Sequence, residues 1–441
     1  MYVRVANSPA GETRDPEEPR EPPGALASAL AVSRERVQDL RVLLGKPLTP
    51  YYLIVGITTL LILTGLVMVL STGAVVDLAE GKSPYADFEK QLIGVAVGLP
   101  LLWLAARSSP RIFRAAAYPL VAVSVLGLLL TLIHGVAQSA NGASRWIDLG
   151  PLQFQPSELA KIALAVWGAD LLARKEKLGM LADWRHMLLP LLPGTAVLAL
   201  LVMAGDDLGT TGILLIIFLT LLWVAGTPTR VFVGMLILMG LVLALLIVTA
   251  GYRSARLTEF FSQANSNPTG TNMQAIQGKI ALGNGGVFGV GLGASRAKWG
   301  WLPEDTSDFI FAIIGEEFGL IGTLCVTALY GGLAFAGLSV ARRAADMFSR
   351  LMAASITAWI VMQAVVNIGA VIGVLPITGV PLPLVSEGLS SLLVTMIALG
   401  MLMSFARRTP GAADALAARG PGGASRVLSW IGLGTREEEH G

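Results

Sequence analysis

Carboxylates and cations stand at unusual places in an otherwise apolar chain. Glu158 and Lys161 are three residues apart in QPSELAK, which puts both side chains on one face of a helix. Pro156 suits the first helical position, and Glu158 falls in the first turn, where the helix dipole favours a carboxylate. Lys161 precedes the apolar run IALAVWGA, which places its ammonium at or just below a membrane surface. The pair is either a structural ion pair or a cation directed at an anionic headgroup, and its depth in a membrane favours the second interpretation.

Acidic residues also stand inside a long apolar stretch that begins at Asp308. Glu316 and Glu317 follow it by eight and nine residues, roughly 12 Å deeper at ~1.5 Å per helical residue. A carboxylate at that depth must be neutral, paired or facing a wet cavity. The flanking Gly315 and Gly319 allow the helix to open there.

Two connecting segments are also unusual. The turn GDDLGT contains Asp206 and Asp207 and is either a plain polar turn or part of a site. The segment LPITGVPLPLVSEG (375–388) has three prolines and no helical period. Irregular backbone near a bilayer is tolerated only where protein or a water-filled cavity surrounds it. We therefore expect this segment to fold back over the mouth of a site, with a plain loop as the alternative.

The composition shows what must position these residues. Of 441 residues, 54% are hydrophobic and 14% charged, against about 25% charged in soluble domains. Residues 1–50 and 409–441 hold 21 of the 62 charges, which leaves 41 for residues 51–408. The mean hydropathy is +0.67. These values indicate an integral membrane core with two polar tails and exclude a soluble enzyme and a disordered chain.

The apolar runs predict an all-α polytopic membrane protein with about ten transmembrane helices and a large external loop between spans 7 and 8. Each span needs about 20 mostly apolar residues. The candidates lie near 51–72, 91–106, 115–135, 158–173, 187–204, 208–226, 231–250, 308–340, 351–373 and 389–406.

Basic residues set the orientation of these spans. Alternate short loops carry 13 Lys and Arg residues on one side and three, Lys82, Lys90 and Arg145, on the other. By the positive-inside rule both termini are cytoplasmic, and every unusual polar segment faces outward. We divide the chain into a largely disordered cytoplasmic tail (1–50), a transmembrane domain (51–408) and a cytoplasmic C-terminal tail (409–441).

Several other functions find no support. The net charge of +2 and the lack of a dense basic tract give no argument for a nucleic-acid partner. The single cysteine, Cys325, excludes an internal disulfide, and the three histidines lack metal-ligand spacing. The charged, Pro-rich N-terminus shows no cleavable signal peptide.

Four blocks resemble one family. They are NGASRWIDLGPLQFQPSELAK, GDDLGT, IALGNGGVFGVGLGASRAKWGWLPEDTSDFIFAIIGEEFGLIG and LPITGVPLPLVSEGLSSLL, in this order across ten spans. Together they resemble the SEDS (shape, elongation, division, sporulation) proteins over residues 50–408. GVGLGASRAKWGWLPED is similar to the cell-division, FtsW-type branch.

The resemblance implies a peptidoglycan glycosyltransferase that polymerises lipid II on the outer face of the bacterial cytoplasmic membrane, at the division septum. It implies a class B penicillin-binding protein and other division proteins as partners. It places the catalytic aspartate at Asp308 and other site residues at Glu158, Lys161 and Asp207. This chain departs from the family at Asp305, Thr306, Ser307, Gly205, Asp206, Glu387 and Leu389.

The chemistry adds further candidates. An external reaction must use a lipid-linked donor, because no nucleotide sugar is available outside, and it needs a base together with positive charge for the departing pyrophosphate. A divalent cation, Mg or Mn, near Asp308 is a candidate, and no organic cofactor is expected. The candidate pyrophosphate-binding cations are Lys161, Arg145, Arg253 and Arg256, and the candidate supporting residues are Glu304, Glu316, Glu317 and Ser386.

Two other functions remain open. A lipid II flippase or other transporter is favoured only by Glu316 and Glu317, since transporter sites tend to lie at the membrane midplane. A non-catalytic scaffold for a penicillin-binding protein is the other alternative, and the retention of Asp308 and Glu158 argues against it.

Overall fold

The computed structural model describes residues 46–79, 81–133, 137–140, 143–148, 153–249, 273–300, 302 and 306–418. Predictions for most of the two tails and for Arg253, Arg256 and Glu304 fall outside these residues. All elements described here belong to one unit, Pro47–Gly441.

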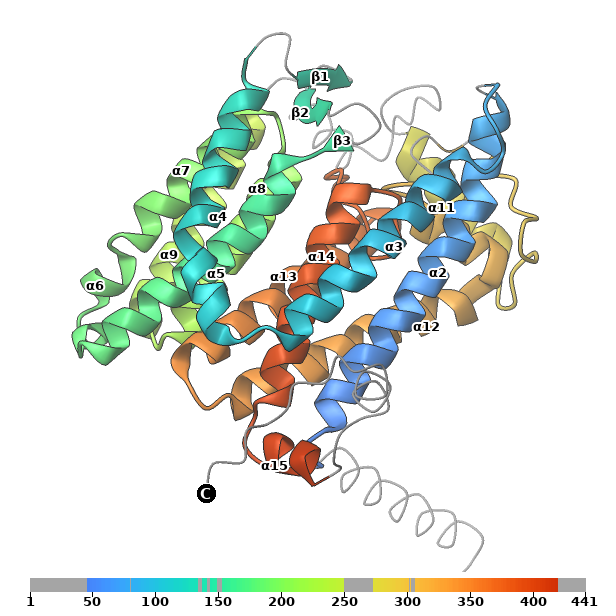
Figure 1. Ribbon diagram of the computed structural model, residues 1–441. Helices are drawn as coiled ribbons and strands as arrows, with labels where there is room; N and C mark the ends of the chain where they lie inside the picture. Colours follow the sequence, from blue (N-terminus) through green and yellow to red (C-terminus); the bar gives the residue numbers. More distant parts are fainter. Residues whose placement is uncertain are drawn as a thin grey trace, which may run out of the picture. The chain divides into compact units, whose positions relative to one another are not determined.

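Each of the ten predicted spans is a helix (Figure 1). In chain order the helices are α2 (Thr49–Ala79), α3 (Ala86–Arg107), α4 (Pro110–Thr131), α5 (Pro156–Lys177), α7 (Leu191–Ala204), α8 (Leu208–Val224), α9 (Thr229–Thr249), α12 (Ile310–Arg343), α13 (Met347–Val371) and α14 (Leu389–Arg407). A 3-10 turn (Met180–Ala182) and the short α6 (Trp184–Leu188) precede α7. Among the described residues seven helices, with α6 and α7 taken as one, are long and apolar enough to cross a membrane, and α8 and α9 are shorter apolar helices.

Helix α5 differs from the other predicted spans in composition, because it carries charged residues from its first turn to its last. It packs against α4, α8 and α13, and protein surrounds most of its side chains. Asp170 in α5 is buried and pairs with Arg114 of α4 at 2.7 Å and with Arg174 at 2.6 Å. Burial with paired partners is how an apolar bundle tolerates such residues.

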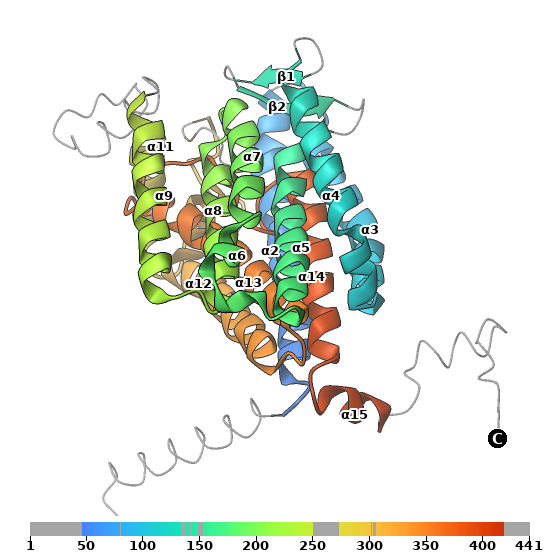
Figure 2. The ribbon, with the colours of Figure 1, turned by 90° about the vertical axis from the view of Figure 1, so that its left-hand side faces the viewer.

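The two ends of the bundle differ. One end carries β1 (Ala137–Ala140), β2 (Ala143–Asp148) and β3 (Gln153–Phe154), which form a small antiparallel sheet in the order β1-β2-β3. The opposite end carries the short α15 (Ala412–Ala417), as Figures 1 and 2 both show. We call these the sheet end and the α15 end. The sequence analysis did not predict the strands, nor α11 (Met273–Gly285) before α12.

Helix α12 is broken where Glu316 and Glu317 predicted an opening. Gly319 has φ 67° and ψ −161° inside the helix, a conformation that needs glycine. The segment that follows α11 docks on the break, with Val290 N donating to Glu316 O at 2.9 Å and Leu320 N to Gly286 O at 2.9 Å. A Cβ added at Gly289 would lie 2.1 Å from Glu317 O, so only glycine permits this approach.

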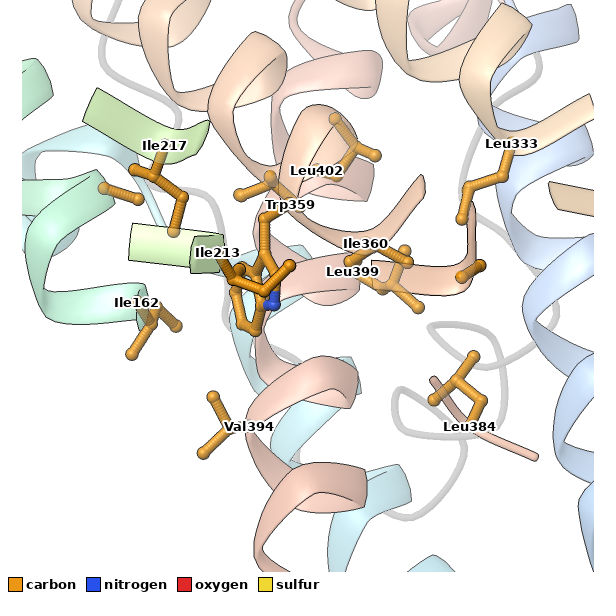
Figure 3. Packing of buried hydrophobic residues seen from close by; sticks show 14 of the residues in the cluster. Ile162, Ile213, Ile217, Leu333, Trp359, Ile360, Leu384, Val394, Leu399 and Leu402 are labelled. Carbon is orange, nitrogen blue, oxygen red and sulfur yellow. The ribbon is translucent and has the colours of Figure 1, made fainter. Parts of the chain in front are cut away.

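The packed core extends through most helices of the bundle, and one part of it surrounds Trp359 between α5, α8, α13 and α14. Trp359 of α13 is fully buried and lies among Ile162, Ile213 and Val394 (Figure 3). This packing fixes the faces of α5 and α13 that carry the polar residues of the site.

Candidate active site

The Glu158–Lys161 pair lies between α5 and α13. Lys161 Nζ is 2.7 Å from Glu158 Oε1, and both side chains are almost completely buried, with 1% and 2% exposed. The ammonium also donates to Gln363 Oε1 at 3.0 Å and lies 5.0 Å from the centre of the Trp359 ring. Protein therefore encloses the ammonium, and its depth in the membrane and its contact with pyrophosphate stay predictions.

A ladder of amides on α13 connects this pair to the next part of the site. Gln363 Nε2 donates to Pro381 O at 3.0 Å. One turn further, Asn367 Nδ2 donates to Val380 O at 2.8 Å and to Asp308 O at 2.7 Å. The two amides, four residues apart on one helix face, thus hold the Pro-rich segment and the backbone of Asp308.

Asp308 lies half-buried at the start of α12. The helix begins at Ile310 with Phe309 as its N-cap, so Asp308 precedes the cap position. A Cβ added at Gly379, which has φ +70°, would lie 3.5 Å from Asp308 Oδ2. The carboxylate therefore lies beside the Pro-rich segment, at the end of α12 that faces the sheet end of the bundle.

The Pro-rich segment folds back onto the bundle, as its sequence predicted. Ser386 Oγ donates to Ser307 O at 2.5 Å and accepts from Leu382 N at 2.7 Å, so this candidate residue fixes the segment next to Asp308. Tyr330 of α12 donates to Pro383 O at 2.6 Å. These bonds satisfy polar backbone that would otherwise be costly to bury.

Glu387 is the last residue but one of this segment. Its N–H donates to Thr306 O at 3.0 Å. Burial, and then the negative charge of Asp87, raise the pKa of the Glu387 carboxyl. Glu387, where this chain departs from the family pattern, is thus bonded to Thr306, which stands two residues before Asp308.

Asp207 joins α8 to the start of α5. Its Oδ1 accepts from Thr210 N at 3.0 Å, which caps α8. Its Oδ2 accepts from Gln155 Nε2 and Ser157 Oγ, both at 3.1 Å. Asp207 is 3% exposed, so its described contacts are those of a positioning residue, and its part in binding substrate stays a prediction.

Arg145 extends from β2 to the turn before α8. Its Nε donates to Gly205 O at 3.3 Å, and its guanidinium also bonds Asp206 O. The structure thus brings Arg145 next to Asp207. Its contact with pyrophosphate stays a prediction.

The carboxylates of Glu316 and Glu317 bind residues of the glycine-rich segment that docks on α12. Glu316 accepts from Ser295 Oγ and, at 3.2 Å, from Ala297 N. Glu317 Oε1 accepts from Ser71 at 2.8 Å and pairs with Lys298 at 3.2 Å. Glu317 is therefore paired with a cation, one of the three outcomes that its depth required, whereas the described partners of Glu316 are neutral hydrogen-bond donors.

The sequence analysis missed three polar residues. Gln363 and Asn367 stand four residues apart inside an apolar span, and that spacing was the signal that could have revealed them. Lys298 is 4% exposed and pairs with a carboxylate distant in sequence. Its partner could not be found by local spacing.

The geometry defines a polytopic membrane protein whose polar motifs gather at the sheet end of the bundle, supported by buried ion pairs and amides. A family model described as cell cycle protein, for FtsW, RodA and SpoVE, matches residues 51–410. The chain belongs to this FtsW/RodA/SpoVE family, which confirms the resemblance to SEDS proteins.

Relatives are similar over most of the chain. The probable peptidoglycan glycosyltransferase FtsW of Mycobacterium tuberculosis is 42% identical over 387 residues, covering 87% of this chain and 73% of that protein. Stage V sporulation protein E of Bacillus subtilis is 34% identical over 364 residues, covering 82% and 98%.

Solved structures share the fold. A chain from a peptidoglycan synthase complex that coordinates polymerization and crosslinking aligns with a TM-score of 0.66 and 28% identity, covering 81% of this chain and 97% of that one. RodA of Thermus thermophilus aligns with a TM-score of 0.56 and 28% identity, covering 80% and 96%.

Proposed function

We propose that this protein polymerises lipid II into glycan strands on the outer face of the bacterial cytoplasmic membrane during cell division. It is a peptidoglycan glycosyltransferase, the activity that names its relatives with 42% and 35% identity. The proposal is supported most directly by the side-chain amides of Gln363 and Asn367 on α13. They link the buried Glu158–Lys161 pair to the Pro-rich segment and to the backbone of Asp308.

The chain is a multi-pass membrane protein, and the proposed orientation follows from its basic residues. The thirteen Lys and Arg residues counted above stand in or next to the ends of helices at the α15 end. The positive-inside rule supports a cytoplasmic α15 end with both termini, and an external sheet end with the site. The septum as its location rests on the similarity to FtsW proteins.

Asp308 is the proposed general base. A carboxylate near the N-terminal end of a helix tends to stay ionised, because the helix dipole favours negative charge there. It accepts the proton of the acceptor 4-hydroxyl while that oxygen attacks the anomeric carbon and the lipid pyrophosphate leaves. An α-linked donor then gives a β-1,4 bond by one displacement with inversion, as a single base allows.

Positive charge for the departing pyrophosphate is the second requirement. Lys161, Arg145, Arg253 and Arg256 are the proposed sources. Gln363 and Asn367 are positioning residues, since Asn367 bonds the backbone of Asp308 and Gln363 bonds the adjacent Pro-rich segment at Pro381.

A divalent cation, Mg or Mn, is proposed at Asp308. Among the described residues no group of three His, Cys, Asp or Glu side chains could hold a metal ion. A cation at Asp308 would therefore take most of its ligands from phosphate oxygens and water, as Mg²⁺ does when it binds a single carboxylate. Bound there, the cation would neutralise pyrophosphate charge.

A class B penicillin-binding protein is the proposed partner. The support is the similarity to a chain of a peptidoglycan synthase complex that coordinates polymerization and crosslinking. The other division proteins follow from the FtsW similarity alone.

The transporter alternative rested on Glu316 and Glu317. Both are 1% exposed and bonded by the docked segment, which supports a structural role for them. A lipid II flippase therefore has less support than a polymerase.

One assay separates the polymerase from the two alternative functions. The purified protein is incubated with lipid II in vesicles, with and without its transpeptidase partner, and the products are resolved as glycan chains. A polymerase produces chains. A flippase moves lipid II between leaflets without producing them, and a scaffold does neither, so either result would refute the proposal.

A further inference from the structure

A pocket of about 340 Å³ lies at the α15 end, remote from the candidate active site. Its lining consists of Ala106 and Arg107 at the end of α3, Arg407 and Arg408 at the end of α14, and Ala413 and Leu416 of α15. We call it the arginine pocket. Helix α14 runs from Ser390, next to the site, to Arg407, which separates the two ends by roughly 25 Å at ~1.5 Å per residue.

The three guanidinium groups are held by neutral partners. Arg107 stacks on Trp103 at 4.5 Å, and Arg407 lies 6.0 Å from the ring centre of Tyr51. Arg408 donates to Ser108 O at 2.9 Å. Stacking and carbonyl bonds orient an arginine without neutralising its charge.

No carboxylate of the described residues forms an ion pair with Arg107, Arg407 or Arg408. Burial, and then the charge of Arg407, lower the pKa of the Arg408 guanidinium. Burial is the larger cause, and the smaller one is repulsion by the like charge of Arg407. A bound anion would relieve that repulsion.

The chemistry of the pocket selects a phosphate. A guanidinium presents a planar fork of donors that matches two phosphate oxygens, and three of them suit a phosphate better than a single carboxylate. Ala106, Ala413 and Leu416 supply an apolar wall beside the arginines.

Its position selects a lipid as the carrier. The pocket lies where membrane-spanning helices end, and Trp103, 53% exposed, marks the level at which aromatic side chains meet lipid headgroups. Basic pockets between transmembrane helices on the cytoplasmic side bind anionic headgroups. We propose that the arginine pocket binds the phosphate of an anionic phospholipid.

The test uses the full chain purified in a mild neutral detergent. Thermal unfolding is measured against increasing phosphatidylglycerol, phosphatidylcholine, or inorganic phosphate at matched ionic strength. We expect a saturable rise in the unfolding temperature with phosphatidylglycerol and a smaller one with the other two. An equal rise with phosphatidylcholine, or with free phosphate, would overturn the proposal of an anionic lipid site.

Variants connect the binding to the pocket. Arg107→Gln/Arg407→Gln should weaken phosphatidylglycerol binding by at least about 10-fold, because it removes two charged donors to the phosphate. The matched control, Arg342→Gln/Arg350→Gln, removes two exposed charges at the same end and should bind normally. Equal losses in both pairs would show general charge attraction and refute the pocket.

A second variant leaves the arginines intact. Ala413 is exposed on α15, so Ala413→Trp should fill the pocket without disturbing the bundle. We expect it to weaken phosphatidylglycerol binding while the lipid-free unfolding temperature stays unchanged. Unaltered binding in this variant, together with unaltered binding in Arg107→Gln/Arg407→Gln, would exclude the site.

Discussion

Asn367 makes two hydrogen bonds that position the backbone around the proposed base. Its replacement by leucine leaves the carbonyls of Asp308 and Val380 without this partner, at about 1–3 kcal/mol for each buried group left unpaired. A misplacement of about 1 Å in a catalytic group can cost about 10²-fold in rate. We therefore expect Asn367→Leu to reduce lipid II polymerisation by about that factor while lipid II binding persists.

The control for Asn367 is another polar residue of α13. Ser355 is buried, and its Oγ has no hydrogen-bond partner among the described residues. Ser355→Ala should retain normal activity. Normal polymerisation by Asn367→Leu would show that the amide ladder does not position Asp308.

The Glu158–Lys161 pair allows a separate test of structure and function. Removing one partner of a buried ion pair costs about 3–5 kcal/mol, whereas replacing both with apolar residues is often tolerated. We expect Lys161→Ala to lose both unfolding temperature and polymerisation. Glu158→Leu/Lys161→Met should recover the unfolding temperature but stay inactive, as measured by thermal unfolding and glycan-chain assays. Normal polymerisation by this double variant would show that the pair serves only to stabilise the packing of the helices.

Local spacing explains which site residues could be predicted. Glu158 and Lys161 lie one turn apart on one helix, so their pairing follows from sequence. Gln363 stands 202 residues from Lys161, and no local pattern indicates that contact. The enclosure of the ammonium by Gln363 and Trp359 could not be predicted for the same reason.

At the scale of elements, the break in α12 depends on glycines of the docked segment. Gly289 has φ +80°, and a Cβ there would meet Glu317 O at 2.1 Å. We expect Gly289→Ala to displace the segment from α12, with lower accumulation in the membrane and a lower unfolding temperature. Gly283→Ala in α11 is the matched control, because a Cβ there meets nothing within 4 Å and alanine favours a helix. Equal stability of the two variants would contradict the proposed docking.

The ten spans and the opening near Gly319 follow from apolar length and from paired glycines around buried carboxylates. The small sheet of β1–β3 and α11 do not follow, because they are short elements in connecting segments whose pairing depends on the bundle beneath them. The folding of the Pro-rich segment back onto the bundle was predictable, because its backbone polar groups need partners near a bilayer. Its bonds to Ser307 and Tyr330 were not predictable.

At the scale of the whole molecule, the orientation can be measured with thiol labelling. After Cys325→Ser, a cysteine replaces either Ser83, exposed between α2 and α3, or Glu176, exposed at the end of α5. We expect an impermeant maleimide added to intact cells to label Ser83→Cys, while Glu176→Cys reacts only after the membrane is opened. The reverse pattern would move the site to the cytoplasm.

Asp308 is the proposed general base of glycosyl transfer, and its replacement by asparagine tests this role. Asp308→Asn is nearly isosteric but cannot accept the proton, and general-base assistance is worth about 10²–10⁴ in rate. The measurement is the initial rate of lipid II polymerisation by the purified protein with its transpeptidase partner, alongside Asp206→Asn, the same chemical change in the turn before α8. We expect a loss of at least about 10² for Asp308→Asn, with lipid II binding retained and Asp206→Asn near normal. A near-normal rate for Asp308→Asn would show that this carboxylate is not the general base.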